Sequence, residues 1–308
     1  MILVINLNAS VDKRYEMKEL IKGSVMRSLK VENTPGGKGV HVANVATILG
    51  EQCIATGFLG GKTGDFIEEK LSEYKIKNDF VKIKGETREC LAIITEDLVQ
   101  TEILEPGPEV SIEEQMEFIE KYKELLENSD IIVASGSVPR NVPKDFYSHL
   151  IFIAKNRGKK FLLDTSGELL SNGINAKPFF IKPNRDEIEA LTGRKIESDE
   201  DAVEEIKRFQ EKGIELVVIS LGSKGSIAGY KDEFYKVTVP KVRAVNPVGS
   251  GDSYVAGIAV SLERGYSIED MLKYASACGT ANAIEEETGS VKESIVNELL
   301  EKIKVEKL

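Results

Sequence analysis

The sequence is poor in the residues that build disulfide frameworks and zinc sites. Its 308 residues include three cysteines, Cys53, Cys90 and Cys278, which are far apart and odd in number. This pattern does not fit a disulfide framework. The two histidines, His41 and His149, form no cluster with cysteine at the spacing of zinc ligands. Disulfide scaffolds and zinc sites are therefore removed from the candidate classes.

The sequence also lacks long apolar runs and an excess of positive charge. No apolar run approaches the length of a bilayer span. The strand-like segment 2–5 opens the chain without the basic region or cleavage site of a signal peptide, so we expect a cytoplasmic protein. The net charge of −10 repels nucleic acid and anionic membranes, and neither is an expected partner. Any phosphate site needs hydrogen-bond donors concentrated locally.

From about residue 130 onward, short apolar runs alternate with amphipathic stretches. Short apolar runs flanked by glycine or polar residues are typical of strands buried on both faces. The predicted strands span 131–134, 161–164, 179–182 and 216–220. Helix starts between them are marked by the pairs Ser111/Glu114, Ser198/Asp201 and Ser267/Asp270. The alternation predicts an α/β fold with a mostly parallel sheet and helices on both faces.

One predicted helix carries a more detailed expectation. After Ser111, the spacing of Met116, Ile119 and Leu126 predicts that these three side chains share its buried face. A second helix, after Ser198, is expected to end at Gly213.

Two polar regions, 13–34 and 82–104, interrupt the alternation of strands and helices. Both are extended in character and poor in helix signals. We expect them to form strands outside the main sheet, as a small β lid over one edge. The chain contains no internal repeat or flexible linker. The prediction is one α/β domain over 1–308, into which the lid is inserted.

The segment 246–253 (NPVGSGDS) precedes an apolar helix predicted over 254–262. Glycines before a helix let the backbone approach a ligand, and the free N–H groups of the first turn attract an anion. Asp252 is predicted in that turn, where a carboxylate can orient a hydroxyl and accept its proton during phosphoryl transfer. A glycine turn with an aspartate favoured by the helix dipole explains the same residues structurally.

The segment 35–39 (PGGKG) precedes another apolar helix, predicted over 40–49 and ended by Gly50. Its glycines suit close backbone approach to a ligand, and Lys38 supplies a point charge for phosphate. The segment is not a P-loop, because the spacing GxxxxGK[ST] is absent. A tight turn with a solvated lysine is the structural alternative.

The segment 182–187 (KPNRDE) allows two interpretations. Asn184 is predicted to cap a helix with Glu187 as its capping-box partner, and by itself the spacing favours this structural role. In the functional interpretation, Glu187 helps to hold Mg²⁺ through water while Asn184 and Lys182 meet the phosphates of ATP.

Two more segments follow predicted strands. The loop 220–225 (SLGSKG) comes directly after a strand, at the edge where α/β sheets bind nucleotides. Asp12 follows the first strand and can accept hydrogen bonds from sugar hydroxyls or cap a turn.

In their order and spacing, these motifs resemble those of the ribokinase-like (PfkB) carbohydrate kinases, and the resemblance covers essentially the whole chain. The matching segments are 8–12 (NASVD), 36–39 (GGKG), 135–139 (SGSVP), 182–187 (KPNRDE) and 249–252 (GSGD). Within the family, three further segments are similar to the branch that holds 1-phosphofructokinase and tagatose-6-phosphate kinase: 85–88 (GETR), 101–108 (TEILEPGP) and 164–167 (DTSG). The implied fold is a three-layer ribokinase-like domain with a β lid.

The resemblance implies roles for individual residues. Asp252 is the implied catalytic base, and the backbone of Gly249, Ser250 and Gly251 the implied anion hole. The residues implied to serve ATP and its Mg²⁺ are Lys182, Asn184, Glu187, Ser220, Gly222, Gly225 and Asn282. Those implied to hold the sugar and its existing phosphate are Asp12, Arg27, Gly37, Lys38, Arg88 and Ser137. A homodimer to which the lid contributes is also implied.

One position departs from the family pattern. His41 stands two residues after GGKG, where the family usually has an asparagine that bonds a sugar hydroxyl. We assign His41 to the substrate site, and the identity of the sugar stays open.

The expected reaction is phosphorylation of fructose 1-phosphate to fructose 1,6-bisphosphate by ATP. Phosphorylation of tagatose 6-phosphate is the main alternative, and of fructose 6-phosphate a weaker one. A non-catalytic sugar-phosphate sensor on the same scaffold is disfavoured because Asp252 and its glycines are present. A nicotinamide oxidoreductase is disfavoured because no GxGxxG follows the first strand.

Overall fold

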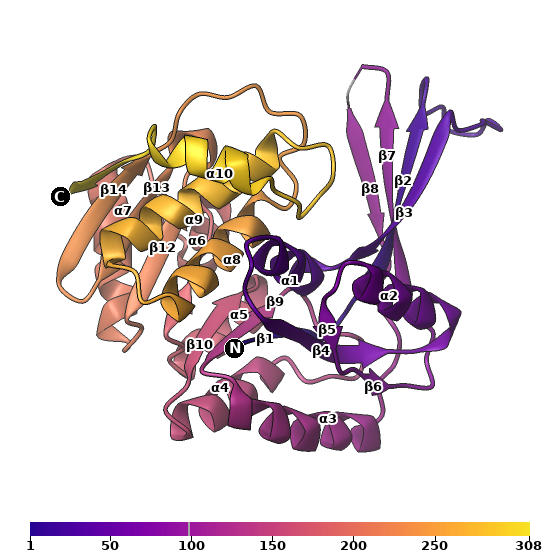
Figure 1. Cartoon of the computed structure of the whole chain (residues 1–308), viewed down its shortest axis with the longest axis horizontal. Helices are drawn as coiled ribbons and strands as arrows, with labels where there is room; N and C mark the ends of the chain where they lie inside the picture. The colour runs from indigo at the N-terminus through magenta and orange to yellow at the C-terminus, as the bar shows by residue number, and fades with distance from the viewer. Residues whose placement is uncertain (98) are drawn as a thin grey trace.

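The computed structural model describes residues 1–97 and 99–308. A large, mostly parallel sheet runs through the molecule, with helices on both sides (Figure 1). Its parallel part has the order β12-β11-β10-β9-β1-β4-β5, with β6 paired to β4, and β13, β14 and β15 extend it antiparallel beyond β12. The strands are β1 (Ile2–Asn6), β4 (Cys53–Leu59), β5 (Lys77–Asn78), β6 (Val81–Lys82), β9 (Ile131–Ser135), β10 (Lys160–Asp164), β11 (Phe180–Ile181), β12 (Leu216–Ser220), β13 (Ser226–Tyr230), β14 (Glu233–Thr238) and β15 (Lys304–Lys307).

The helices form the two outer layers, because alternate side chains of each strand face opposite sides and both sides are apolar. On one face, Ile2 and Val4 of β1 belong to a core with α1 (Lys38–Ile48), α2 (Gly61–Glu73), α8 (Ser250–Glu263), α9 (Ile268–Ala283) and α10 (Glu293–Leu300). On the other, Leu3 and Ile5 belong to a core with α3 (Ile112–Leu125), α4 (Phe146–Asn156), α5 (Gly167–Asn175), α6 (Arg185–Thr192) and α7 (Asp199–Glu211). Two 3₁₀ turns complete the list, η1 (Leu126–Asn128) and η2 (Gly222–Lys224). The expected three-layer α/β fold is confirmed.

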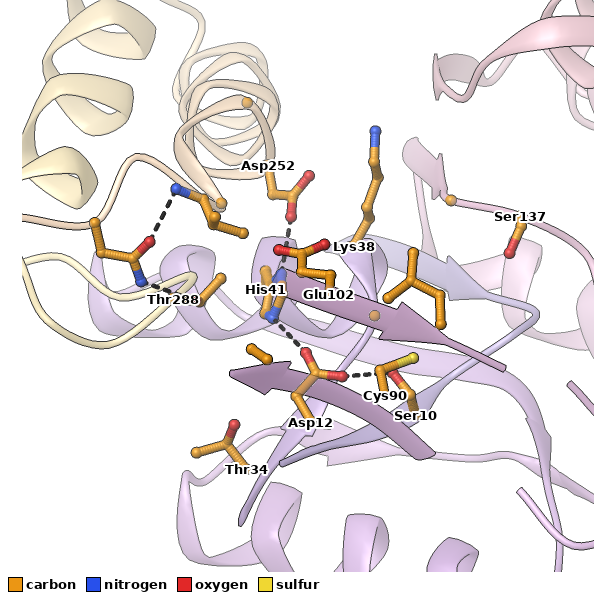
Figure 2. Close-up of a pocket in the computed structure, with 18 of the residues that line it drawn as sticks. Ser10, Asp12, Thr34, Lys38, His41, Cys90, Glu102, Ser137, Asp252 and Thr288 are labelled. Atoms are coloured by element: carbon orange, nitrogen blue, oxygen red, sulfur yellow. Dashed lines mark hydrogen bonds and ion pairs between the residues drawn. The ribbon is translucent and has the colours of Figure 1, made fainter. Parts of the chain in front are cut away.

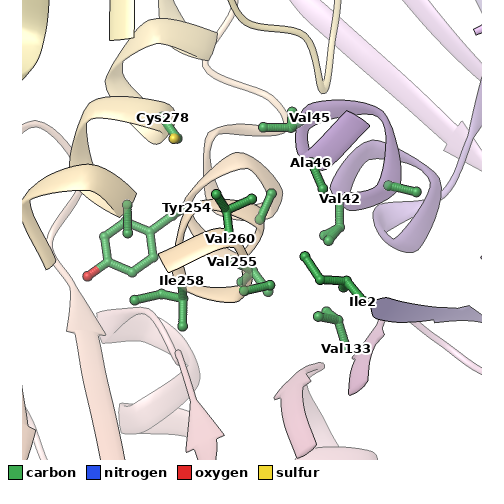
Figure 3. Close-up of a cluster of buried hydrophobic side chains, with 14 of the residues drawn as sticks. Ile2, Val42, Val45, Ala46, Val133, Tyr254, Val255, Ile258, Val260 and Cys278 are labelled. Carbon is green, nitrogen blue, oxygen red and sulfur yellow. The ribbon is translucent and has the colours of Figure 1, made fainter. Parts of the chain in front are cut away.

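Helix α8 is the most deeply packed of the helices that reach the site. Figure 3 shows Val255 of α8 facing Ile2 and Val133 of the sheet, with α1 on one side and Cys278 of α9 on the other. A Cβ atom on Gly257 would lie 2.6 Å from the Cα of Ala275, so α8 and α9 touch backbone to backbone. This packing fixes the direction of α8 and therefore the position of its N-terminus.

A second, four-stranded sheet rises from one end of the large sheet (Figure 1). Its order is β3 (Lys30–Gly36), β2 (Ser10–Met17), β7 (Arg88–Thr95) and β8 (Gln100–Leu104). It is made from the two segments that were expected outside the main sheet. Three boundaries differ from the expectation: β2 begins at Ser10, β3 extends to Gly36, and Lys82 belongs to β6, which pairs with β4 of the large sheet. Residue 98, inside the second of these segments, lies outside the described residues.

The strands, helix caps and helix end that were predicted from short stretches of sequence are largely confirmed. The four predicted strands are present as β9, β10, β11 and β12, although β11 is shorter than expected. Capping boxes begin α3, α6 and α7, and the side chain of Ser267 caps α9. Gly213 has a φ of 96° directly after α7 and ends it as predicted.

The predicted face of α3 is right for two of its three residues, since Leu126 is fully buried and Ile119 packs against the core. Met116 is 65% exposed, whereas Phe118 and Tyr122 are fully buried. These two aromatic side chains are four residues apart and fill the space over the sheet with Phe58 and Phe146. Their larger apolar surface decides which face of the helix turns inward. In the described ranges, no helix is both long and apolar enough to cross a membrane.

Candidate active site

An open cleft of about 1030 Å³ lies between the carboxyl edge of the large sheet and the small sheet. Five parallel strands contribute residues at or just beyond their carboxyl ends: Asn6, Gly136, Asp164, Lys182 and Ser220. The N-termini of α1 and α8 and the small sheet also contribute to the lining. The cleft thus brings the separate sequence motifs to one place, as expected for the carboxyl edge of an α/β sheet.

The loop before α8 points its backbone into the cleft. Gly249 caps α8 in the left-handed conformation, with a φ of 82°, and a Cβ atom there would lie 2.7 Å from the backbone nitrogen of Gly289. Only glycine fits this position without strain. Gly249, Gly251 and Asp252 line the cleft, and Asp252 lies in the first turn as predicted. Free N–H groups at a helix N-terminus and a carboxylate therefore face the same space.

The buried side chain of Asn282 is hydrogen-bonded to this loop. Its side-chain nitrogen donates to the backbone oxygen of Val248 at 2.8 Å, and its oxygen accepts from the backbone nitrogen of Gly289 at 2.8 Å. Asn282 is fully buried and does not line the cleft. The structure therefore gives Asn282 a role in shaping the loop, in place of the direct contact with ATP that was expected.

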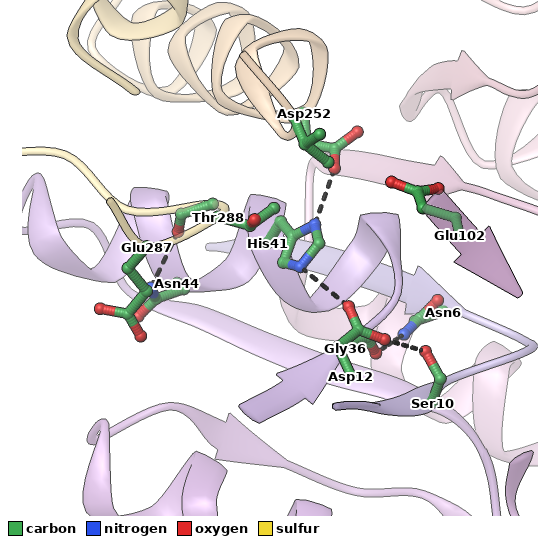
Figure 4. A network of polar contacts seen from close by, with 12 residues as sticks. Asn6, Ser10, Asp12, Gly36, His41, Asn44, Glu102, Asp252, Glu287 and Thr288 are labelled. Carbon is green, nitrogen blue, oxygen red and sulfur yellow. Dashed lines mark hydrogen bonds and ion pairs between the residues drawn. The ribbon is translucent and has the colours of Figure 1, made fainter. Parts of the chain in front are cut away.

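His41 links two carboxylates across the cleft (Figure 4). Its Nδ1 lies 2.8 Å from Oδ2 of Asp252, and its Nε2 lies 3.8 Å from Oδ2 of Asp12. The hydroxyl of Ser10 donates to the other oxygen of Asp12 at 2.7 Å. Burial acts to lower the pKa of His41, but the carboxylates of Asp252 and Asp12 outweigh it and hold the pKa above its ordinary value. Burial raises the pKa of Asp12, against the opposing charge of His41.

Two lysines of the cleft share one carboxylate. The Nζ atoms of Lys38 and Lys182 each lie 3.4 Å from an oxygen of Asp164. Asp164 is buried, and burial alone would raise its pKa, but the two ammonium groups hold it below the ordinary value. The same carboxylate raises the pKa of Lys38. Lys38 was assigned to the sugar phosphate and Lys182 to ATP, so Asp164 ties together the two expected phosphate sites.

Asn184 and Glu187 form the capping box that the sequence predicted. The Asn184 side chain accepts from the backbone nitrogen of Glu187 at 2.8 Å, and Oε2 of Glu187 accepts from the backbone nitrogen of Asn184 at 2.8 Å. Both residues also line the cleft beside Lys182. Among the described residues, no three His, Cys, Asp or Glu side chains gather as a metal cluster.

This donor set fits a magnesium ion that arrives with phosphate and keeps most of its waters. One carboxylate oxygen of Glu187 remains outside the capping box. A single carboxylate is a normal protein contribution to such an ion, and a dedicated protein cage is not needed.

Arg88 lies at the opposite side of the cleft and is anchored to backbone. Its Nε and Nη2 donate to the backbone oxygen of Asn8 at 3.2 and 2.9 Å, and its Nη1 donates to that of Glu105 at 2.8 Å. The side chain of Asn8 in turn donates to the hydroxyl of Ser137 at 3.0 Å. Figure 2 shows Lys38 between the His41 contacts and Ser137. Lys38, Arg88 and Ser137 therefore line one cleft, as predicted.

Three other assigned residues lie elsewhere. Arg27 is exposed and does not line the cleft, because it lies beyond the end of the β2–β3 pair at Glu16 and Lys30, whereas the Ser10 end meets the cleft. Gly222 lines an adjoining hollow of about 340 Å³ with Ser220 and Asn184. Gly225 is buried, and a Cβ atom on it would lie 1.9 Å from the backbone oxygen of Val237, so tight packing explains this glycine. The expected contacts of Arg27 and Gly225 with substrates are not supported in this structure.

Sequence reasoning missed several residues of the cleft. Asp164 was noted only as part of a family motif, although its place at the end of a parallel strand is the same signal that identified Asp12. Glu102 of β8 lines the cleft and was likewise noted only within a family motif. The residues 286–288 also line it. No local pattern marks them, because only the fold brings them there.

Comparisons of sequence and of structure both find similarity to kinases of sugars and sugar phosphates. A family model described as pfkB family carbohydrate kinase matches residues 2–294. A tagatose-6-phosphate kinase of Staphylococcus epidermidis is 42% identical over 311 residues, which cover 99% of both chains. Phosphofructokinase-2 from Escherichia coli, solved in complex with potassium, has a TM-score of 0.91 at 26% identity and covers 97% of this chain and 98% of its own. A possible 1-phosphofructokinase from Thermotoga maritima has a TM-score of 0.90 at 26% identity, covering 100% and 99%.

Proposed function

Because the chain belongs to the pfkB family of carbohydrate kinases, we propose that it transfers the γ-phosphate of ATP to a hydroxyl of a ketohexose phosphate. The family membership and the 42% identical relative establish a sugar-phosphate kinase with an alcohol as acceptor. What we propose are the roles of the individual site residues, magnesium as the metal, and the identity of the sugar.

The observation that carries the proposal is the position of Asp252. It is buried in the first turn of α8, beside a glycine backbone that faces the cleft. The sugar hydroxyl oxygen attacks the γ-phosphorus, the bond from that phosphorus to the bridging oxygen of ADP breaks, and the hydroxyl proton passes to the Asp252 carboxylate. The backbone N–H groups around Gly249, Ser250 and Gly251 stabilise the negative charge of the transferred group. Positioning and charge stabilisation are what a loose phosphoryl-transfer transition state requires.

The two phosphate sites follow from the placement of cations. Lys38, Arg88 and Ser137 lie where they can hold the phosphate that the sugar already carries, while Asp12 and Gly37 meet its hydroxyls. Lys182 lies on the side of Asn184, Ser220 and Gly222, which we assign to ATP. Magnesium bound to ATP, held through water by Glu187, would neutralise phosphate charge. ATP as the donor fits a cytoplasmic enzyme.

Two sugars are favoured by different observations. The 42% identical relative is named tagatose-6-phosphate kinase, which favours tagatose 6-phosphate. The structural neighbour at a TM-score of 0.90 is described as a possible 1-phosphofructokinase, and this favours fructose 1-phosphate, the acceptor expected from the sequence. Fructose 6-phosphate is the third candidate. His41 contacts both Asp12 and Asp252, the two carboxylates that we assign to the acceptor hydroxyls.

We also propose that the small sheet contributes to a homodimer. Val31 and Ile103 of this sheet are 47% and 53% exposed, and neither lines the cleft. Exposed apolar side chains on a sheet with free edges favour association with a second copy. Light scattering after gel filtration tests this part separately: a dimeric mass supports it, and a monomer at micromolar concentration contradicts it.

A substrate panel tests the main proposal. We expect ADP release with magnesium and ATP to depend on a ketohexose phosphate, with kcat/KM highest for tagatose 6-phosphate or fructose 1-phosphate. Fructose 6-phosphate and unphosphorylated hexoses serve as comparison acceptors, and chelation of magnesium should stop the reaction. Binding of these sugars without phosphoryl transfer would instead support the sensor. Transfer to unphosphorylated hexoses alone would overturn the assignment to sugar phosphates.

A further inference from the structure

His41 is held between the two carboxylates that the proposed function places on either side of the sugar. It comes from α1, whereas Asp252 comes from α8 and Asp12 from β2. The side chain of His41 is 11% exposed, and that of Asp252 is 8% exposed. A Cβ atom on Gly289 would lie 2.4 Å from the Cβ of His41, so the backbone of that loop covers the base of the histidine side chain. The ring therefore has little freedom to turn away.

Both ring nitrogens face a carboxylate oxygen (Figure 4), Nδ1 at 2.8 Å and Nε2 at 3.8 Å. A neutral imidazole has one N–H donor and one acceptor nitrogen, so it can satisfy only one of two carboxylates and presents a lone pair to the other. An imidazolium donates from both nitrogens. The contact with Asp252 is a hydrogen bond, and the longer one with Asp12 is an ion pair, so a ring that is protonated and positively charged fits both carboxylates best.

The charges on the surrounding elements act in the same direction. Glu287, in the segment after α9, adds a third negative charge that raises the pKa of His41. Glu102 of β8 lies across the cleft and acts on Asp12. The cation on the same helix, Lys38, is paired with Asp164. These contributions exceed the effect of burial, which would favour the neutral ring.

We propose that His41, protonated on both nitrogens, is a positioning residue that ties the base Asp252 to the sugar-binding Asp12. This inference rests on the proposed role of Asp252. The proton on His41 orients the Asp252 carboxylate so that its second oxygen faces the acceptor hydroxyl. The second proton, on Nε2, holds Asp12 at the sugar by charge attraction. Sugar binding and base orientation therefore depend on one titratable group, which an asparagine at this position would not supply.

The sign of the pH dependence follows from the direction of the shift. The pKa of His41 is raised above 6.5, so the imidazolium is complete below 6.5 and is lost as the pH rises through the raised value. Loss of one N–H and of the positive charge between the two carboxylates then weakens the contact of His41 with Asp12 and Asp252. We expect kcat/KM for the sugar phosphate to fall at least about tenfold across this transition. The KM for ATP should not change, because ATP contacts neither His41 nor Asp12 in the proposed arrangement.

Two variants separate positioning from simple packing. His41→Asn keeps an amide that donates without titrating, so its kcat/KM should be independent of pH across the window where the wild type falls. His41→Leu keeps the volume and removes both donors, so its kcat/KM should be at least about tenfold lower at all these pH values. His149→Asn, on the exposed surface of α4, is the matched control and should keep the wild-type profile. An unchanged fall in His41→Asn overturns the proposal.

Nuclear magnetic resonance of the imidazole groups tests the same claim without any turnover. The chain has only two histidines, and His149→Asn identifies the His41 signal. We expect His41 to titrate above 6.5 in the free protein and to titrate at a lower pH in Asp252→Asn. Titration at or below 6.5, or no response to Asp252→Asn, overturns the link even if His41→Leu fails to fold. If the wild type phosphorylates no ketohexose phosphate but these titrations behave as expected, the proposed function fails and the link between the side chains stands.

Discussion

Replacement of Asp164 by asparagine tests the ion pairs of the cleft, because it removes one charge that two lysines share. The carboxylate lies 3.4 Å from the Nζ atoms of both Lys38 and Lys182. Asp164 is 3% exposed and Lys182 is 7% exposed, whereas Lys38 is 43% exposed. The substitution keeps the shape of the side chain and removes its charge, which leaves two ammonium groups without their shared partner.

The pair with Lys182 and the pair with Lys38 contribute differently to the free energy of unfolding. Removal of one partner of a buried ion pair costs about 3–5 kcal/mol, because the other charge stays buried and unpaired. This cost applies to Lys182. The pair with Lys38 is half open to water and contributes about 0–1 kcal/mol. Because the cleft admits water, we expect Asp164→Asn to lower the free energy of unfolding by about 3 kcal/mol, the low end of the buried range.

Urea unfolding with a matched control measures this value. Asp130→Asn breaks the exposed pair of Asp130 and Lys159, whose atoms are 2.8 Å apart and whose carboxylate is 81% exposed. That control should lose no more than about 1 kcal/mol. Equal losses in the two variants would refute the reasoning, since they would mean that Lys182 is fully solvated.

Inorganic phosphate supplies a second test of the same prediction. An anion that binds only the folded state stabilises it, by about 2.7 kcal/mol at a hundredfold excess over its Kd. With Asp164 neutral, the unpaired ammonium groups should bind phosphate more tightly than in the wild type. We expect phosphate to raise the urea midpoint of Asp164→Asn more than that of the wild type, while kcat falls because the lysines lose their orientation. Equal stabilisation of both proteins would contradict this account.

Three more predictions address single roles in the cleft. Asp252→Asn should keep ATP binding, measured by calorimetry, and lose at least about a hundredfold in kcat, the low end of base catalysis; a near-normal kcat would exclude Asp252 as the base. Glu187→Gln should raise the magnesium concentration needed for half-maximal rate, while thermal unfolding changes little because glutamine also completes a capping box; an unchanged magnesium profile would leave Glu187 with a capping role alone. Arg88→Ala should lower kcat/KM for ketohexose phosphates roughly tenfold to a hundredfold and affect unphosphorylated hexoses far less. Because Arg88 also donates to the backbone of Asn8 and Glu105, equal losses on both substrate classes would show that it acts through the fold.

The parts of the fold that could be predicted from sequence are those that depend on short separations. A capping box links residues three apart, and the predicted pair Asn184 and Glu187 forms its two hydrogen bonds as expected. Buried parallel strands are likewise visible as local apolar runs, and β9 and β10 appear where they were predicted. Met116 was wrongly placed on the buried face of α3, because the choice between it and the aromatic pair depends on what the helix packs against.

The sequence predicted which motifs belong to the site, but it did not predict which of their side chains contact each other. Motif order indicated that Asp12, Lys38 and Asp252 belong to one site, and all three line the cleft. The contact between His41 and Asp252 joins residues 211 positions apart, and no local spacing encodes it. Arg27 shows the converse: its charge suited a phosphate, but the direction of the β2–β3 pair carries it away from the cleft.

The charges that line the cleft are a physical reason to expect a cation to bind together with the nucleotide. Among the described residues that line the cleft, eight are carboxylates: Asp12, Glu32, Glu102, Asp164, Glu187, Asp252, Glu286 and Glu287. Five are lysine or arginine: Lys13, Arg14, Lys38, Arg88 and Lys182. The lining is therefore net negative even where two phosphorylated substrates must meet, and Asp164 already offsets two of the cations. Two anions can share such a space only if positive charge enters with them, and a divalent ion on the nucleotide supplies it while leaving the carboxylates free to orient hydroxyls. The overall charge of −10 is thus compatible with an anionic substrate because the helix N-terminus, the paired lysines and the metal act within a few ångströms, where the field of distant surface charges is screened.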